Sequence, residues 1–218
     1  MTDAEQAPNF VLDLPLTALA KVVLICAPHA EKPPSFGPFG CIHFFVRAGQ
    51  LYAFATDRYT MAVHGTGVDA DAGVQFSLTV SQAKFILAAF RAGKGSSPLL
   101  NLRSESGALK LSLAGGALSE VMDVRMAIEQ TTFETQPQKS QIAVIEKFFK
   151  EEEAPEGHFM LDPARLSKLP KLRGFNGCVV RHSQGMVGVI GTDWMVIFAK
   201  YRGVEEDFIK PWRTVFGM

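Results

Sequence analysis

Apolar and polar positions alternate along the chain with two periods, about two residues and three to four residues, which are typical of strands and amphipathic helices. Strands are predicted in short runs rich in Val, Phe, Ile and Leu that are separated by Gly, Ser, Asn and Asp. The predicted strands span residues 10–14, 41–47, 51–65, 74–78, 99–103, 109–113, 118–123, 159–161, 178–182, 186–190 and 194–202.

Helices are predicted where the apolar spacing lengthens and a start signal precedes it. Pro15 suits the first position of a helix, and Thr79 followed by Gln82 matches a capping box. Asp162 before Pro163 predicts another helix start. The predicted helices span residues 15–27, 80–92, 141–153 and 163–173, and the proline-rich residues 29–40 are predicted to be a loop.

The order strand, helix, strands occurs more than once and predicts an α+β protein of two domains. Polar residues between 126 and 140 indicate a linker, which divides a first domain at 9–125 from a shorter second domain at 141–203. Residues 204–218 form a C-terminal segment that is unusually apolar for a chain end. This segment could pack on its own domain, cover a subunit edge or be presented to a partner.

Composition narrows the class of protein. The 22 basic residues balance the 22 acidic ones, so overall charge indicates no partner, and 47% hydrophobic residues support a core. The longest apolar stretch, residues 16–27, contains Lys21 and is shorter than the ~20 residues that cross a bilayer. The acidic N-terminus lacks signal-peptide features, and three cysteines favour a reducing, cytoplasmic location.

Two segments align without gaps, residues 54–63 and residues 190–199. Each consists of an apolar strand, a Thr-Asp turn and a second apolar strand. Thr and Asp are ordinary turn residues, because their side chains bond nearby backbone groups. Each segment also follows a strand, a helix and another strand, and this agreement indicates an internal duplication.

The first of these segments resembles the DNA sliding clamps, the processivity factors of DNA polymerases. Bacterial clamps carry Ala-Thr-Asp-Gly-His/Tyr-Arg-Leu-Ala, and residues 55–62 here read Ala-Thr-Asp-Arg-Tyr-Thr-Met-Ala. Residues 121–125 are similar to the segment that leads out of a clamp domain, and residues 198–202 are similar to the closing strand. Arg58 and Thr60 replace the Gly and Arg of the motif.

The resemblance implies a DNA-clamp fold, with helices on one face of antiparallel sheets, and a protein that is not an enzyme and needs no cofactor. Its partners would be double-stranded DNA, bound without sequence preference, a DNA polymerase and a clamp loader. A ring of six domains would need a homotrimer of this chain. A phage or otherwise divergent clamp is favoured, located at the nucleoid or in the host cytoplasm.

Clamp helices line the central hole, so they should be basic. The regions 79–94 and 163–174, which contain two of the predicted helices, have no Asp or Glu, and in the first of them Lys84 and Arg91 share a face opposite Phe85. Such charges suit sequence-independent phosphate contacts, and the alternative is an ordinary solvated helix face. The predicted DNA-binding residues are Lys84, Arg91, Lys94, Arg165, Lys168, Lys171 and Arg173.

Clamps recruit partners through peptides that enter an apolar pocket beside the Thr-Asp motif and the last strand. The alternative is that Met61 and Ile197 are plain core residues, and Thr60 in place of Arg changes the expected peptide specificity. The pocket residues implied by position are Thr56, Tyr59, Thr60, Met61, Ile197 and Ala199.

Two other classes of protein stay open. A clamp-fold adaptor would bind protein partners without closing a ring on DNA. A hydrolase with zinc would use the pairs Cys26/His29 and Cys41/His43, whose spacing a metal could accept. The sequence has no Gly-x-Ser-x-Gly nucleophile elbow, phosphate loop or dinucleotide glycine motif, so nothing in it requires catalysis.

Overall fold

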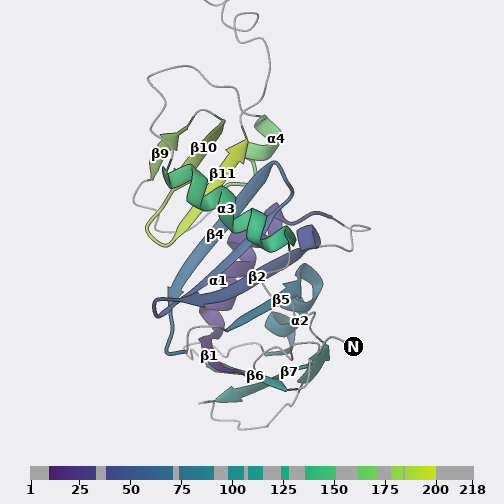
Figure 1. Ribbon diagram of the computed structural model, residues 1–218. Helices are drawn as coiled ribbons and strands as arrows, with labels where there is room; N and C mark the ends of the chain where they lie inside the picture. Colours follow the sequence, from purple (N-terminus) through teal and green to yellow (C-terminus); the bar gives the residue numbers. More distant parts are fainter. Residues whose placement is uncertain are drawn as a thin grey trace, which may run out of the picture.

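The computed structural model describes residues 10–32, 38–70, 74–90, 98–105, 108–114, 124–127, 136–150, 162–170, 178–183 and 185–199. The described chain is a mixed α+β structure of two antiparallel sheets and packed helices (Figure 1). The predicted fold class is therefore confirmed. The predicted strands at 118–123 and 159–161 and the C-terminal segment lie outside the described residues.

The smaller sheet has the strand order β1-β6-β7-β8. Leu12 and Leu14 of β1 point into the core, opposite Leu102 and Leu100 of β6. Its strands are β1 (Val11–Pro15), β6 (Leu99–Glu105), β7 (Ala108–Ala114) and β8 (Val124–Ala127). The strand β8 lies at the edge of the region predicted to be a linker.

The larger sheet has seven strands in the order β5-β2-β3-β4-β11-β10-β9. The first four come from the predicted first domain and the last three from the second, and β4 pairs with β11 in antiparallel fashion. The division into two domains stays a prediction. The strands are β2 (Cys41–Arg47), β3 (Gln50–Thr56), β4 (Thr60–Gly67), β5 (Gln75–Thr79), β9 (Val179–His182), β10 (Met186–Ile190) and β11 (Trp194–Ala199).

The strand predicted at 51–65 is in fact two strands, β3 and β4. Thr56 and Asp57 end β3 in a tight turn, and the chain returns from Thr60, which agrees with the strand, Thr-Asp turn and second strand predicted at 54–63. The hairpin between β2 and β3 was predicted at the correct place. Ala48 and Gly49 have φ of 52° and 70°, which match the left-handed residues of a two-residue hairpin loop.

The helices α1 (Leu16–Cys26) and α2 (Val80–Ala89) pack together and share one apolar core with residues of both sheets. The capping box before α2 is confirmed, because Thr79 Oγ1 accepts from the Gln82 backbone N–H at 3.1 Å and Gln82 Oε1 accepts from that of Thr79 at 2.8 Å. Phe85, which the sequence places on the face opposite Lys84 and Arg91, is half exposed on α2, one helical turn from the exposed Ser81.

The helix predicted at 163–173 is a single turn in the described chain, α4 (Pro163–Leu166). Its N-terminus is as expected, because Asp162 accepts a hydrogen bond from the Ala164 backbone N–H at 2.9 Å. The residues that follow, 167–170, continue as turns. A short 3-10 helix, Ala27–His29, lies where the predicted helix meets the predicted loop, and a second one, Pro38–Gly40, lies inside the predicted loop.

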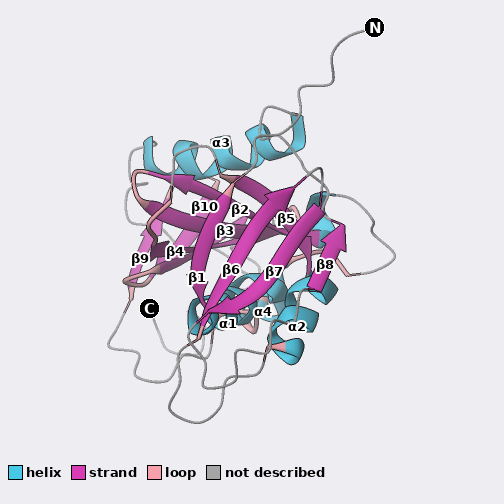
Figure 2. Ribbon diagram, turned by 90° about the horizontal axis from the view of Figure 1, so that it is seen from below, coloured by secondary structure: helices cyan, strands magenta, loops and turns pink. Residues whose placement is uncertain are grey.

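The helix α3 (Gln136–Lys150) begins five residues before the predicted position and lies on the opposite face of the seven-stranded sheet from α1, α2 and α4 (Figure 2). Phe148 of α3 is fully buried against the sheet. It packs directly on Gly188 of β10, where an added Cβ would lie 2.4 Å from the ring. Glycine at this position therefore permits the close approach of α3.

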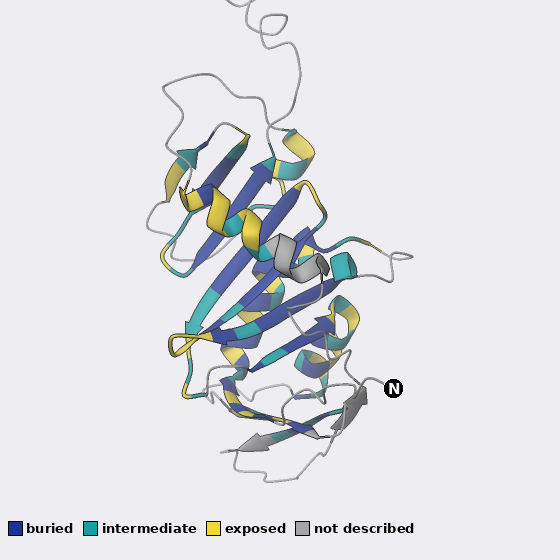
Figure 3. Cartoon of the chain, viewed as in Figure 1, coloured by how far each residue is buried: buried dark blue, intermediate teal, exposed yellow. Residues whose placement is uncertain are grey.

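The outward face of α3 is exposed, in contrast to the buried strands beneath it (Figure 3). Among the described helices, none has the length and apolar character that crossing a membrane would require.

The two Thr-Asp turns lie in equivalent hairpins but not in equivalent positions. The first turn closes between Asp57 and Thr60, and the second closes between Gly191 and Trp194. The gapless alignment is therefore wrong by two residues at the turns, because Thr192 and Asp193 occupy the centre of the second turn whereas Asp57 begins the first. In the sheet, Ala62 pairs with Val196 at the middle of the β4–β11 contact.

Candidate functional site

The first Thr-Asp turn is built around the carboxylate of Asp57. Its Oδ1 accepts from the backbone N–H of Tyr59 at 3.1 Å and of Thr60 at 2.7 Å, and from the Thr60 hydroxyl at 2.9 Å. Thr56 Oγ1 donates to the Thr60 carbonyl at 2.8 Å. These bonds hold Arg58 at a φ of 74°, a left-handed conformation that usually favours glycine. The turn role expected for Asp57 is thus confirmed.

The same carboxylate joins the turn to the chain around α4. Asp57 Oδ2 forms an ion pair with Lys168 Nζ. The His29 ring, which is fully buried, lies between the two segments, with Nδ1 2.9 Å from Thr60 Oγ1 and Nε2 3.2 Å from the Lys168 carbonyl oxygen. We call His29, Asp57, Thr60 and Lys168 the first turn cluster. It connects parts of the chain more than 100 residues apart.

Burial sets the protonation of the first turn cluster. It lowers the pKa of His29 from 6.5 to about 4, and the nearby Lys168 acts in the same direction. A neutral imidazole has one N–H, so His29 donates to only one of its two neighbours at a time. Burial alone would raise the pKa of Asp57, but hydrogen bonds from Lys168 and Thr60 outweigh it, and the pKa is lowered.

A second cluster lies at the other end of the β4–β11 contact. Lys21 of α1 forms an ion pair with Asp193 Oδ2 at 3.3 Å, and His64 Nδ1 lies 2.8 Å from the Asp193 carbonyl oxygen. Burial lowers the pKa of His64, and its Nε2 is buried without a partner among the described residues. We call Lys21, His64 and Asp193 the second turn cluster. In both clusters, a lysine from one of the two predicted domains forms an ion pair with the turn aspartate of the other predicted domain.

The structure describes three of the seven predicted DNA-binding residues. Lys84 is exposed on α2, and no described residue forms an ion pair with it. Arg165 stacks over the Tyr59 ring at 4.2 Å and contacts Asp162 at 3.5 Å, and Lys168 is bound to Asp57. Arg91, Lys94, Lys171 and Arg173 lie outside the described residues.

The residues predicted for a partner pocket come together where β4 begins and β11 ends. Tyr59 is 56% exposed and Ala199 is partly exposed, and the Ala199 backbone N–H donates to the Tyr59 carbonyl oxygen at 2.9 Å. The other four, Thr56, Thr60, Met61 and Ile197, are buried. The accessible part of this group is therefore Tyr59, with Arg165 above its ring.

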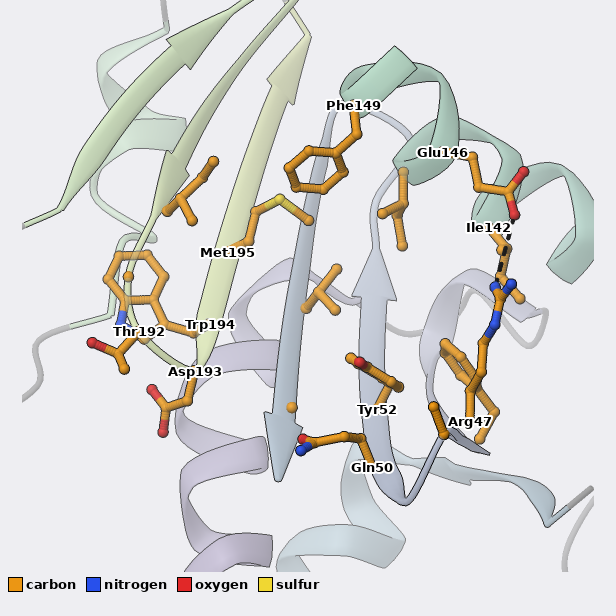
Figure 4. A pocket seen from close by; sticks show the side chains of 17 residues that line it. Arg47, Gln50, Tyr52, Ile142, Glu146, Phe149, Thr192, Asp193, Trp194 and Met195 are labelled. Atoms are coloured by element: carbon orange, nitrogen blue, oxygen red, sulfur yellow. Dashed lines mark ion pairs between the residues drawn. The ribbon is translucent and has the colours of Figure 1, made fainter. Parts of the chain in front are cut away.

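A cleft of about 590 Å³ lies elsewhere, between α3 and the larger sheet (Figure 4). Phe149 and Ile142 of α3 form one wall, and Tyr52 and Met195 lie among the residues of the sheet wall. At the rim, Arg47 contacts Glu146 at 3.9 Å. We call this the α3 cleft. The sequence indicated the apolar face of α3 but not the cleft, because the residues of its other wall come from β2, β3, β4, β10 and β11.

The cysteine and histidine pairs considered for zinc have other contacts. Cys26 is buried, its Sγ lies 3.6 Å from the Ala53 carbonyl oxygen, and burial raises the pKa of the thiol. His43 lies 2.7 Å from Ser77 Oγ and 2.6 Å from the Pro38 carbonyl oxygen. Within the described ranges, no three His, Cys, Asp or Glu side chains are grouped as metal ligands.

Solved structures similar to this one are consistently bacterial DNA polymerase III β subunits. The β subunit of Thermotoga maritima matches 92% of this chain and 67% of its own, with a TM-score of 0.66 and 11% identity. The chain has the sliding-clamp fold. The sliding clamp of Bartonella birtlesii, bound to griselimycin, matches 93% of this chain and 68% of its own, with a TM-score of 0.67 and 9% identity.

A sliding clamp of Pseudomonas aeruginosa, solved with a ligand, gives a TM-score of 0.62 at 14% identity over 92% of this chain and 67% of its own. No protein-family model matches the sequence, and neither does any curated protein. The resemblance inferred from residues 55–62 is thus confirmed as a likeness of the sliding-clamp fold, which is retained although few residues are identical.

Proposed function

We propose that this protein is a DNA sliding clamp, which encircles duplex DNA as a ring and tethers a DNA polymerase. The observation that carries the proposal is the sliding-clamp fold over more than nine-tenths of the chain. The position of α1, α2 and α4 on one side of the larger sheet supports it, since this leaves one helical surface to face the DNA (Figure 2). The proposed role is non-enzymatic.

The proposed DNA surface consists of the seven basic residues predicted from the helices. Lys84 is its best described member, because it is exposed and no ion pair with a described residue competes for its charge. Lys168 and Arg165 would contribute less, since Asp57 and Asp162 already offset their charges. We therefore expect Lys84 to dominate the phosphate contacts made by the described residues.

Charge reversal tests the DNA surface. Lys84→Glu should weaken binding to a short DNA duplex by about threefold or more and reduce the slope of log affinity against log salt by about one. The matched control is Lys150→Glu, a reversal at an exposed lysine on the opposite face of the sheet. Fluorescence anisotropy with two unrelated duplex sequences measures both. Equal losses for the two variants, or a strong preference for one sequence, would contradict the proposal.

Ring closure is tested separately by the mass of the assembly. We propose a homotrimer, so light scattering after size exclusion should give three times the 23.8 kDa of one chain. A clamp loader and closed circular DNA then provide the topological test. A clamp should stay on the circle and leave after linearisation, whereas a protein that merely adheres to DNA stays on both forms.

The proposed partner pocket is centred on Tyr59 and Ala199. A peptide could add apolar contacts beside Tyr59, displacing Arg165 from its ring. Tyr59→Ala should then weaken the binding of a polymerase peptide and leave the DNA affinity unchanged, as measured by calorimetry and anisotropy.

A second candidate function is a clamp-fold adaptor that binds protein partners without encircling DNA. The internal contacts of Lys168 and Arg165 favour it, because they remove two charges from the proposed DNA surface. For an adaptor, Lys84→Glu should leave partner binding intact, and the chain should stay a monomer at every concentration.

A further inference from the structure

The α3 cleft is an apolar site that the clamp proposal does not use. Its walls include Phe149, which is 50% exposed, and the partly exposed Tyr52 and Ile145. Figure 4 shows the Phe149 ring pointing toward the Met195 side chain. A cleft of this size is comparable to those that bury a drug-sized molecule or a few aromatic side chains.

The walls of the cleft are fixed by packing. Phe148, adjacent to Phe149, is fully buried and rests on Gly188 of β10. On the opposite wall, the Trp194 indole packs on Gly191, where an added Cβ would lie 2.4 Å from Nε1. The contact between Phe148 and Gly188 prevents a closer approach of α3 to the sheet, so the helix itself does not fill the space beside Phe149.

We infer that the α3 cleft binds the C-terminal segment of the same chain, residues 204–218. This inference does not depend on the proposed DNA-clamp function. The segment lies outside the described residues, and it is rich in large apolar side chains that can serve as anchors. These side chains are Phe208, Ile209, Trp212, Val215 and Phe216.

The chain between β11 and the C-terminal segment is long enough for the segment to reach the α3 cleft. Ala199 ends β11, whereas Trp194 and Met195, at its start, line the cleft. The distance along the strand is about 17 Å, at about 3.3 Å per residue. The connecting residues 200–207 span up to about 27 Å when extended, so Phe208 and the residues after it can reach the cleft.

Tethering favours this occupant over a second copy or a foreign peptide. A short linker gives an effective concentration of ~1 mM at the cleft. A competing peptide at micromolar concentration would have to bind about a thousandfold more tightly to displace the segment. Charge gives little preference for one alignment of the segment in the cleft. The rim has the oppositely charged Arg47 and Glu146, and the segment also contains both basic and acidic residues.

The two tryptophans of the chain make the inference testable, because Trp194 lines the cleft and Trp212 lies in the segment. The intact protein is labelled with 5-fluorotryptophan, and Trp212→Phe assigns the two ¹⁹F resonances. We expect the Trp212 resonance to be shifted from its position in urea. Phe149→Glu should return it to that position, and Trp212→Ser should shift the Trp194 resonance from across the cleft.

Phe85→Glu is the matched control, because Phe85 is a half-exposed phenylalanine on α2, on the other side of the sheet. It should move neither resonance. A Trp212 resonance that coincides with its urea position, or that ignores Phe149→Glu, would overturn the inference. A shift that depends on concentration between about 20 and about 500 µM would also overturn it, because the occupant would then belong to a second copy.

Discussion

Two aspartates lie in hairpin turns at opposite ends of the β4–β11 contact, and each is bound by a lysine from the other part of the chain. Around Asp57 the pair is largely buried, with side-chain exposures of 16% for Asp57 and 27% for Lys168. Around Asp193 the exposures are 39% and 57% for the aspartate and Lys21. The same residue types thus meet in two different environments.

The two turn clusters therefore share the same arrangement of lysine and turn aspartate but differ in the interactions that stabilise them. Asp57 organises its own turn through three hydrogen bonds, and His29 extends the network to Lys168. Asp193 contributes a backbone carbonyl to His64 and an exposed ion pair to Lys21. We therefore expect the first turn cluster to hold the two parts together and the second to add little.

The largest expected effect comes from removing the two carboxylates in turn. Asp57→Ala leaves Lys168 without its partner and three donors without an acceptor, so it should reduce the free energy of unfolding by about 3 kcal/mol. Asp193→Ala should reduce it by less than about 1 kcal/mol, because an exposed pair is screened by water. Urea denaturation measures both. Equal losses would show that the two clusters are energetically equivalent.

The pH dependence of stability sharpens the comparison. His29 has a folded-state pKa of about 4, below its ordinary 6.5, so the unfolded chain binds more protons and stability falls as pH drops from 6.5 to 4. The fall can reach about 3 kcal/mol. Asp57 acts in the same direction, but only as pH falls below its ordinary pKa of 3.8. His29→Asn should flatten the profile between pH 4 and 6.5, measured by urea unfolding at each pH, and an unchanged slope would contradict this role.

The smallest effect concerns backbone strain in the turns. Arg58 has a φ of 74°, so Arg58→Gly should raise the free energy of unfolding by up to about 1 kcal/mol. The loss of its exposed contacts with Glu31 and Phe39 offsets part of the gain. Thr192→Gly is the comparison in the second turn, where Thr192 is not among the described residues with positive φ. It should destabilise the protein slightly in thermal melts, and a gain there would show that glycine itself, not strain, matters.

Much of the fold could be predicted from local signals. The capping box at Thr79, the Asp162 cap and the hairpin at Ala48 and Gly49 each act within four residues, and all three are present. The Thr-Asp turn at residues 56–57 was also identified, and with it the resemblance to clamps. Such features are readable because the interacting groups are neighbours in the sequence.

The candidate site was only partly predictable. The basic residues of the helices were identified by composition, yet composition does not show that Asp57 binds Lys168 or that Tyr59 lies beneath Arg165. Both segments of the predicted repeat form hairpins, but the alignment between them was out of register by two residues at the turns. A shift of two preserves the strand periodicity, so no hydrophobic pattern could reveal it.

The sequence by itself determined the element types, the turn chemistry and the clamp-like arrangement of strand–helix–strand units, because short-range propensity and periodicity act within a few residues. Only the tertiary structure decided that β4 pairs with β11, that α3 covers the face opposite α1, and that a cleft lies beside Phe149. These features depend on contacts between side chains that lie far apart in the sequence. Non-local contacts of this kind follow from the packing of the whole chain, which no single segment encodes.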